Sequence, residues 1–322
     1  FNDTAATEIY TLSLHDALPI YLLATGRLPE AHAAVLTARD DLPPIRAEGH
    51  RQHPPIMPPE SISPLPATGR IGIIAAMRDE LSAVLDRMPD EHKTRVAGRS
   101  FWRGHWHGRE VVAVLSRIGK VAAATTATAL IERFQVEAIV FTGVAGGLAE
   151  GVNVGDVVVA RSFLQHDMNA SPLFAQHEVP LYGRARFDTE AGMSDSLAAA
   201  ARQVLADPQA ALGAAAVTEF GLQAPRVHEG LILSGDRFVA TSAESEALRQ
   251  RLPDGLAVEM EGAAVAQVCH DYDLPFVAMR TISDRADDAA HTDFTRFVEQ
   301  VASHYSVAML DAWLEGLTRP AS

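Results

Sequence analysis

Short, continuous apolar runs recur along the chain from Ile71 onward. A run of this kind, bounded by polar or glycine-rich residues, is typical of a strand that is buried on both faces. The runs are IGIIAAM (71–77), EVVAVLS (110–116), AIVFTGVAGG (138–147), GDVVVARSF (155–163), GLILSGD (230–236) and PFVAMRTISD (275–284). Residues 101–107, FWRGHWH, alternate instead, which predicts a half-exposed strand.

Stretches with apolar residues at helical spacing separate these runs. They predict helices over 78–88, 120–134, 194–206, 244–252 and 292–317, and residues 256–273 predict a strand that leads directly into a helix. The last helix has one apolar stripe, formed by Phe294, Phe297, Val298, Val301, Tyr305, Ala308, Met309 and Trp313. Buried strands that alternate with helices predict an α/β fold, with a mostly parallel or mixed twisted central sheet flanked by helices on both faces.

The N-terminal part of the chain lacks this pattern. Ten of the 18 prolines lie in residues 1–70, and segment 40–69 has no hydrophobic period. We interpret residues 21–69 as a proline-rich disordered leader, in which Met57 is a candidate start. Residues 2–20 resemble the translation of a common sequencing adapter and differ from it only at Ala6, so we interpret residues 1–20 as non-native. The folded domain is then expected at 70–318, followed by a tail at 319–322.

The composition excludes several classes of function. The formal net charge of −14 argues against binding to nucleic acid or to an anionic membrane, because both require a basic face. A single cysteine, Cys269, excludes an intramolecular disulfide and a cysteine-rich zinc site. Residues 17–25 contain Pro19 and follow no basic segment, so they make a poor signal peptide, and no apolar run approaches the roughly 20 residues of a membrane span. We therefore expect a cytoplasmic protein.

Candidate chemistry lies where the predicted strands end, because ligands bind there in open α/β sheets. The glycines at 143, 146 and 147 resemble a phosphate-binding loop only weakly, since neither a dinucleotide nor a P-loop spacing is present. Two interpretations stay open for these glycines. They form either a tight turn with close packing or a backbone surface that lies against a flat base or ribose.

Carboxylates follow several of the same strands. Glu259 and Glu261 flank Met260, and although the helix dipole alone favours an acidic residue at a helix start, a carboxylate can also accept two hydrogen bonds from a vicinal diol. Asp284 ends a buried strand, where it either caps the next turn or serves as a general acid. Together Glu80, Glu261 and Asp284 suggest hydrolysis through an oxocarbenium-like transition state.

Two histidines, His105 and His107, could share one face of the strand at 101–107. With no third ligand nearby, we predict no metal site.

Seven stretches carry a resemblance to a known family. They are IGIIAAMRDE (71–80), SRIGKVAAA (116–124), TGVAGGL (142–148), VGDVVVA (154–160), SGDRFV (234–239), AVEMEGAAVAQVCH (257–270) and RTISD (280–284). In order and spacing they resemble the 5′-methylthioadenosine/S-adenosylhomocysteine nucleosidases of the nucleoside phosphorylase superfamily. The resemblance covers about Ile71 to Leu317 and implies a nucleoside phosphorylase-like fold.

This resemblance implies a hydrolase of methionine salvage that uses neither cofactor nor metal. The enzyme would cleave the N-glycosidic bond of 5′-methylthioadenosine and S-adenosylhomocysteine, releasing adenine and a thioribose product. By position, Glu80 would activate the water and Arg280 would orient it, while Asp284, helped by Ser283, would protonate N7 of the purine.

The resemblance also implies a set of substrate-binding residues. Glu261 would hold the ribose hydroxyls, Met260 would lie against the ribose, Phe238 would stack on adenine, the backbone of Val239 would read the edge of the base, and Phe294 would lie near the alkylthio group. The remaining predicted binding residues are Val144, Ala145, Gly146 and Glu259. The family implies a homodimer in which the partner subunit helps to close the alkylthio pocket.

Two positions depart from the family pattern: Val144 stands where many members carry serine, and Arg117 replaces a small residue. The alternative functions are a related purine nucleoside phosphorylase, a nucleosidase of different purine specificity, and a non-catalytic binding protein on the same fold. Val144 argues against a phosphorylase, which uses a hydroxyl near that position to hold phosphate. The presence of all three carboxylates argues against the binding protein.

Overall fold

The computed structural model describes residues 69–222, 224–286 and 294–318. The predicted segment 1–20, the predicted leader apart from Gly69, residues 292 and 293 of the last predicted helix, and the tail at 319–322 lie outside the described residues.

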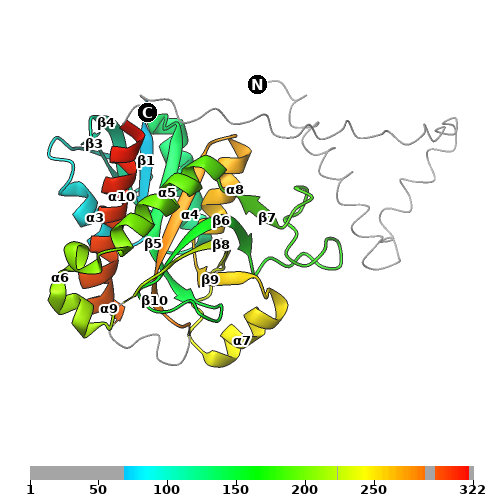
Figure 1. Ribbon diagram of the computed structural model, residues 1–322. Helices are drawn as coiled ribbons and strands as arrows, with labels where there is room; N and C mark the ends of the chain where they lie inside the picture. The colour runs from blue at the N-terminus through cyan, green and yellow to red at the C-terminus, as the bar shows by residue number, and fades with distance from the viewer. Residues whose placement is uncertain (1–68, 223, 287–293, 319–322) are drawn as a thin grey trace, which may run out of the picture. The chain divides into compact units, whose positions relative to one another are not determined.

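Ten strands in the described part of the chain form one mixed sheet (Figure 1). They are β1 (Ile71–Ala75), β2 (His92–Val96), β3 (Arg99–Trp106), β4 (Arg109–Leu115), β5 (Ala138–Gly147), β6 (Val157–Gln165), β7 (Arg186–Asp188), β8 (Val227–Ser234), β9 (Gly255–Glu259) and β10 (Phe276–Asp284). The strand order is β10-β6-β8-β9-β5-β1-β4-β3-β2, with β7 paired to β6. The predicted mixed sheet is confirmed.

Part of this sheet closes on itself. Strand β10 pairs with β5 in parallel and with β6 antiparallel. Strand β8 pairs in parallel with both β6 and β9, and β9 pairs antiparallel with β5. These five strands therefore form a ring, which brings the carboxyl ends of β5 and β10 to the end of β9.

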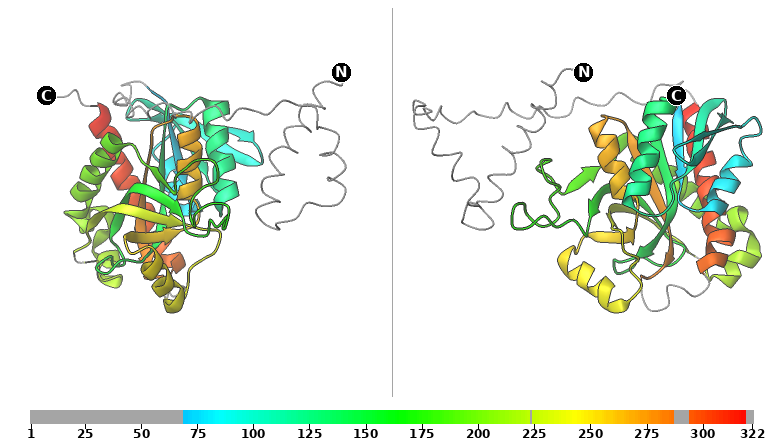
Figure 2. Two further views of the ribbon diagram at one scale, coloured as in Figure 1. Left: turned by 90° about the vertical axis from the view of Figure 1, so that its right-hand side faces the viewer. Right: turned by 180° about the vertical axis from the view of Figure 1, so that it is seen from behind.

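Helices cover both faces of the sheet, as predicted. They are α3 (Arg78–Leu85), α4 (Lys120–Phe134), α5 (Ala191–Leu205), α6 (Pro208–Glu219), α7 (Ser242–Arg251), α8 (Gly262–Asp271), α9 (Phe294–Phe297), the π-helical turn η2 (Val298–Ala302) and α10 (Ser303–Thr318). Helix α10 packs against α3 and α5 on one face, and α4 packs against α8 on the other (Figures 1 and 2).

The continuous apolar runs are explained by this double coverage. In β1, Ile71 and Ile73 pack into the core beneath α3, α5 and α10, whereas Ile74 packs into the core beneath α4 and α8. Strand β5 alternates in the same way, with Val140 on the first side and Phe141 on the second. Because both faces are buried, neither strand needs polar residues at alternate positions.

Three elements were absent from the sequence-based expectation. Strand β2, HKTRV, is exposed over most of its length at the edge of the sheet, so it has no apolar signal. Helix α6 is rich in alanine, has little polar contrast between its faces, and is interrupted at Gly213, where φ is 79°. The three-residue strand β7 is too short to show a period.

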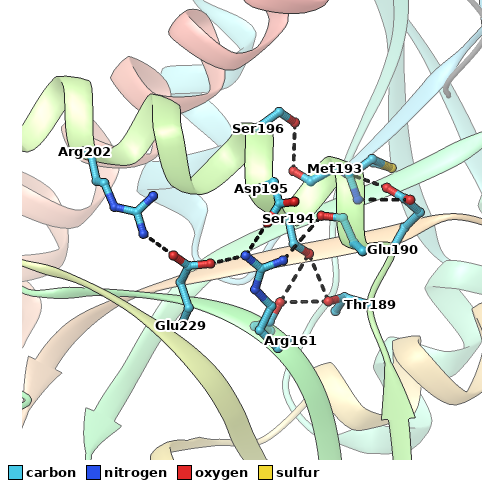
Figure 3. A network of polar contacts seen from close by, with 12 residues as sticks. Arg161, Thr189, Glu190, Met193, Ser194, Asp195, Ser196, Arg202 and Glu229 are labelled. Atoms are coloured by element: carbon cyan, nitrogen blue, oxygen red, sulfur yellow. Dashed lines mark hydrogen bonds and ion pairs between the residues drawn. The ribbon is translucent and has the colours of Figure 1, made fainter.

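A polar network fastens α5 to the sheet (Figure 3). Arg161 of β6 pairs with Asp195 of α5 and with Glu229 of β8, and Glu229 also pairs with Arg202 of α5. At the start of α5 the Glu190 side chain accepts from the amides of the first turn. This network holds the helix against which α10 packs.

Candidate active site

A cavity opens at the carboxyl ends of β5, β9 and β10. All nine predicted substrate-binding residues and two of the four predicted catalytic residues line it: Val144, Ala145, Gly146, Phe238, Val239, Glu259, Met260, Glu261, Phe294, Ser283 and Asp284. Five further residues that had no predicted role complete the lining: Ala76, Met77, Ile118, Arg237 and Val258. The predicted segments at the strand ends therefore meet at one place, because the ring of strands brings their ends together.

Glu80 does not line the cavity but is completely buried and hydrogen-bonded to Met77, which does line it. It is the third residue of α3, and its Oε2 accepts a hydrogen bond of 3.0 Å from the amide of Met77, the residue that caps the helix. Its Oε1 accepts from the Ser306 hydroxyl at 3.0 Å. Burial raises the pKa of Glu80 to about 7, although these hydrogen bonds and the charge of Arg280 oppose the shift. A carboxyl group that titrates near neutrality suits a general base.

Arg280 is also completely buried, and its strongest partner is Glu259. The Arg280 Nη2 atom lies 2.8 Å from Glu259 Oε2, and its Nη1 donates to the carbonyls of Phe141 and Met279. The guanidinium carbon lies 4.1 Å from the centroid of the Phe141 ring. Arg280 Nε is buried without a hydrogen-bond partner among the described residues, on the side where Gly143 passes. Arg280 therefore influences Glu80 through its charge, while a direct ion pair holds it to Glu259.

Glu259 organises the turn between β9 and α8. Its carboxylate accepts hydrogen bonds from the Ser234 hydroxyl and from the amides of Glu261 and Gly262, in addition to the ion pair with Arg280. These contacts engage both oxygens within the protein. Of the two carboxylates that flank Met260, Glu261 is therefore the better placed to meet a ligand.

Glu261 faces the cavity from the start of α8 but makes no capping hydrogen bond to that helix. Instead its Oε1 accepts from the amide of Gly119, at the start of α4, at 2.7 Å. Burial and the neighbouring Glu259 carboxylate raise the pKa of Glu261. The preference for an acidic residue at the start of α8 therefore does not explain the contacts that the Glu261 side chain makes.

Asp284 closes the cavity at the end of β10. Its Oδ1 accepts from the amide of Ala286 at 2.7 Å, and its Oδ2 accepts from the Ser283 hydroxyl at 2.8 Å. The predicted capping contact is therefore present, and the side chain nevertheless lines the cavity. Ser283 also lines the cavity, beside the carboxyl group that it contacts.

The glycines of β5 neither turn nor form a phosphate loop, because the strand continues through Gly147. A β-carbon at Gly146 would lie 2.9 Å from Asp284 Oδ1, and one at Gly143 would lie 2.9 Å from the Ala76 β-carbon. The prediction of a tight turn is wrong, and the prediction of close packing is correct. Glycine at position 146 gives the Asp284 carboxylate room beside the strand.

The two histidines of β3 and its turn contact different carboxylates. His105 Nδ1 lies 2.7 Å from Asp90 Oδ2, and His107 Nε2 lies 3.0 Å from Asp311 Oδ1. Among the described residues no group of three His, Cys, Asp or Glu side chains is arranged to hold a metal ion.

In the same residues, no helix has the length and apolar character needed to cross a membrane.

Sequence reasoning assigned no role to Ile118, Gly119 or Ser306. Ile118 and Gly119 lie within the family-like stretch 116–124, which was a usable signal. Ser306 has no such local signal, since it reaches Glu80 only through the packing of α10 on α3.

Comparisons with known proteins identify the family of this chain. The family model of the phosphorylase superfamily matches residues 70–314. The 5′-methylthioadenosine/S-adenosylhomocysteine nucleosidase of Chromohalobacter salexigens is 38% identical over 248 residues, which are 77% of this chain and 97% of the relative. The corresponding nucleosidase of Shewanella pealeana is 35% identical over 77% of this chain and all of its own length.

Solved structures give the same result. The nucleosidase of Neisseria meningitidis in complex with methylthio-immucillin-A is 32% identical, with a TM-score of 0.68 over 77% of this chain and 99% of its own. Futalosine hydrolase of Helicobacter pylori is also 32% identical, with a TM-score of 0.65 over 77% of this chain and 98% of its own. The chain belongs to the phosphorylase superfamily and, within it, to the 5′-methylthioadenosine/S-adenosylhomocysteine nucleosidases.

Proposed function

We propose that this chain hydrolyses the N-glycosidic bond of 5′-methylthioadenosine and S-adenosylhomocysteine. The observation that carries the proposal is the arrangement of three carboxyl groups: Glu261 and Asp284 line one cavity, and the buried Glu80 is hydrogen-bonded to the amide of the lining residue Met77. The relatives that this chain matches over nearly their whole length are named nucleosidases of these two compounds.

In the proposed reaction the bond between C1′ and N9 of the purine breaks, and its electron pair moves to the base. Asp284 donates a proton to N7, so that adenine leaves as a neutral molecule. The Ser283 hydroxyl orients the Asp284 carboxyl through the 2.8 Å hydrogen bond. General acid catalysis of this kind typically contributes about 10²–10⁴-fold.

Water attacks C1′ from the opposite side, and Glu80 accepts its proton. A carboxyl with a pKa of about 7 is both sufficiently basic and sufficiently ionised for this step near neutral pH. Arg280 supplies a fixed positive charge near Glu80 and the site of the water. The products are adenine and the 5-alkylthioribose.

The remaining lining residues fit the parts of a nucleoside. Glu261 accepts hydrogen bonds from the ribose hydroxyls, and Met260 lies against the sugar. Phe238 lines the cavity and is 45% exposed, so its ring can stack on a planar base, and the Val239 backbone meets the edge of that base. Val144, Ala145 and Gly146 form the β5 wall, Glu259 holds the β9–α8 turn, and Phe294 lies near the alkylthio group.

We further propose that the enzyme acts as a homodimer in the cytoplasm, in methionine salvage. Ile118 lines the cavity but is 73% exposed, and Val121, the second residue of α4, is 78% exposed. Large apolar side chains so exposed at the rim of a binding cavity are suited to cover by a second copy of the chain. Sedimentation of the purified protein tests the dimer, and cell fractionation tests the location.

The competing candidate is a phosphorylase, and one assay separates the two. Release of the free purine base is measured from 5′-methylthioadenosine, S-adenosylhomocysteine and futalosine, each with and without phosphate, and the base and the sugar product are identified. We expect free 5-alkylthioribose at a rate that phosphate does not change. A sugar 1-phosphate would assign the chain to the phosphorylases, and turnover of futalosine alone would assign it a different nucleoside.

A further inference from the structure

A hydrogen bond links Glu80 to the C-terminal helix across 226 positions of the chain. The Ser306 hydroxyl of α10 donates to Glu80 Oε1 at 3.0 Å. Ser306 is 1% exposed and Glu80 is fully buried, so no bulk water competes for this contact. The Met77 amide occupies the other oxygen, and the carboxylate is therefore held at both ends.

A second hydroxyl extends this contact into the sheet. Thr142 Oγ1 of β5 lies 2.6 Å from Ser306 Oγ and is likewise buried. A hydroxyl has one proton to donate and lone pairs to accept with. When Ser306 gives its proton to the Glu80 carboxylate, Thr142 can donate to Ser306. When Glu80 is protonated, it can donate to Ser306, and Ser306 can donate to Thr142. The three groups can therefore stay hydrogen-bonded whether the carboxyl is charged or neutral.

The backbone of the C-terminal segment places Ser306 for this contact. Phe294 at its start lines the cavity, and the π-helical turn η2 lies between Phe294 and Ser306. In that turn the Ser303 amide donates to the Val298 carbonyl, five residues earlier rather than four. A wide turn changes which side of the later helix faces the sheet, and such turns are frequent at functional sites.

We propose that Ser306 is a positioning residue for the general base, with Thr142 as its outer support. The Ser306 hydroxyl holds the Glu80 carboxylate in one orientation and favours its charged form before the nucleoside binds. This inference deepens the proposed function and rests on it, because it requires Glu80 to take the proton from water.

The proposal has a direct consequence for the ionisation of Glu80. Burial already raises the pKa of Glu80 to about 7, and the Ser306 hydrogen bond is one of the contacts that limit this rise. Arg280 is the charged group that acts on Glu80, and its charge limits the rise as well. Removal of the Ser306 hydroxyl therefore raises the pKa of Glu80 further and leaves less of the charged base at neutral pH.

The test compares Ser306→Ala, Thr142→Val and Ser303→Ala by the pH dependence of kcat/KM for adenine release. On the acidic side of the profile kcat/KM falls as Glu80 is protonated, and we call this fall the acid limb. For Ser306→Ala we expect the acid limb to move up by about one pH unit, the size typical of one hydrogen bond to a charged group. At a pH on that limb, kcat/KM should then be lower by about tenfold. Thr142→Val, which keeps the shape and removes only the outer hydroxyl, should move the limb in the same direction by less.

Ser303→Ala is the matched control. Ser303 is 4% exposed on the same helix, and its hydroxyl donates to the Glu299 carbonyl rather than to Glu80. Its acid limb should coincide with that of the unmodified protein. A folded Ser306→Ala protein with an unshifted limb would overturn the proposal, even if its melting temperature fell. Should Ser306→Ala not fold, an unshifted limb in Thr142→Val would overturn it.

Glu80→Gln separates this inference from the proposed function. If Glu80→Gln releases adenine at the normal rate, Glu80 is not the base, and the proposed mechanism fails together with the inference. If Glu80→Gln is inactive while Ser306→Ala keeps the original limb, only the positioning role of Ser306 fails.

Discussion

The Nη2 atom of Arg280 lies 2.8 Å from Oε2 of Glu259, and both side chains are buried. This ion pair connects β10 to β9 beneath the cavity, and Glu259 uses its other contacts to hold the turn that leads to Glu261. Breaking a buried pair by removing one charge costs far more than the pair itself contributes, because the remaining charge is left uncompensated. The structural role of Glu259 can therefore be measured through the free energy of unfolding, without an activity assay.

Glu259→Gln keeps the shape of the side chain and removes its charge. We expect the free energy of unfolding to fall by about 3–5 kcal/mol, since Arg280 then lies in the core without its counter-ion. Urea unfolding followed by tryptophan fluorescence measures this change. Glu246→Gln is the control, because Glu246 pairs with Arg249 on the exposed face of α7 and should change stability by less than about 0.5 kcal/mol. Equal effects at the two positions would contradict the argument.

Asp284→Asn should remove the proton donor without removing the fold. The Asn oxygen can still accept from the Ala286 amide, and the Ser283 hydroxyl can turn to accept from the new amide group. We expect kcat for adenine release to fall by at least about 10²–10⁴-fold, with an unchanged circular dichroism spectrum. Asp254→Asn changes an exposed partner of Arg186 and should leave kcat unaltered. Near-normal turnover of Asp284→Asn would place the acid elsewhere.

Gly146→Ala tests whether Asp284 needs the space beside β5. The added methyl group would lie 2.9 Å from Asp284 Oδ1 and 2.8 Å from the Ala286 β-carbon, so at least one of them must move. A displacement of the acid by a fraction of an ångström should lower kcat by tenfold or more, an order-of-magnitude expectation. Gly316→Ala in α10 meets no atom within 4 Å, and it should leave kcat unchanged while stabilising the helix by about 0.5–1 kcal/mol.

The sequence was sufficient for the elements whose signal is local. The runs at 138–147 and 275–284 predict β5 and β10 closely, because a strand buried on both faces has a continuous apolar pattern. The predicted helix at 120–134 matches α4 to the residue. Strand β2 and helix α6 were missed, since an exposed edge strand and an alanine-rich helix lack such contrast.

The site, like the fold, has parts that a local sequence signal predicts and parts that it does not. The lining residues other than Phe294 lie in the seven stretches that resemble a family, and they meet in one cavity. What the sequence could not provide is the pairing between distant side chains. The ring of five strands, the Arg280–Glu259 ion pair and the Ser306–Glu80 hydrogen bond each join segments whose proximity depends on tertiary packing.

Glu80→Gln should stabilise the protein in a way that depends on pH. In the unfolded chain Glu80 has its ordinary pKa of 4.5, whereas in the folded protein it is raised to about 7. Between these values the folded state holds a proton that the unfolded state has lost, so the free energy of unfolding falls as pH rises through this window. A shift of that size corresponds to about 3 kcal/mol at full effect.

Glutamine cannot lose a proton, so its free energy of unfolding lacks this contribution. Its Oε1 can keep the Met77 amide bond, and its amide group can donate to Ser306, which then acts as an acceptor. The variant and the unmodified protein should be similar in stability near pH 4, and the variant should be more stable by up to about 3 kcal/mol near pH 8. Urea unfolding at a series of pH values measures the difference, and a difference that does not change with pH would refute the raised pKa. At pH 8 the same variant should bind 5′-methylthioadenosine and fail to turn it over, because the ribose and base contacts come from other residues and only the proton acceptor is lost.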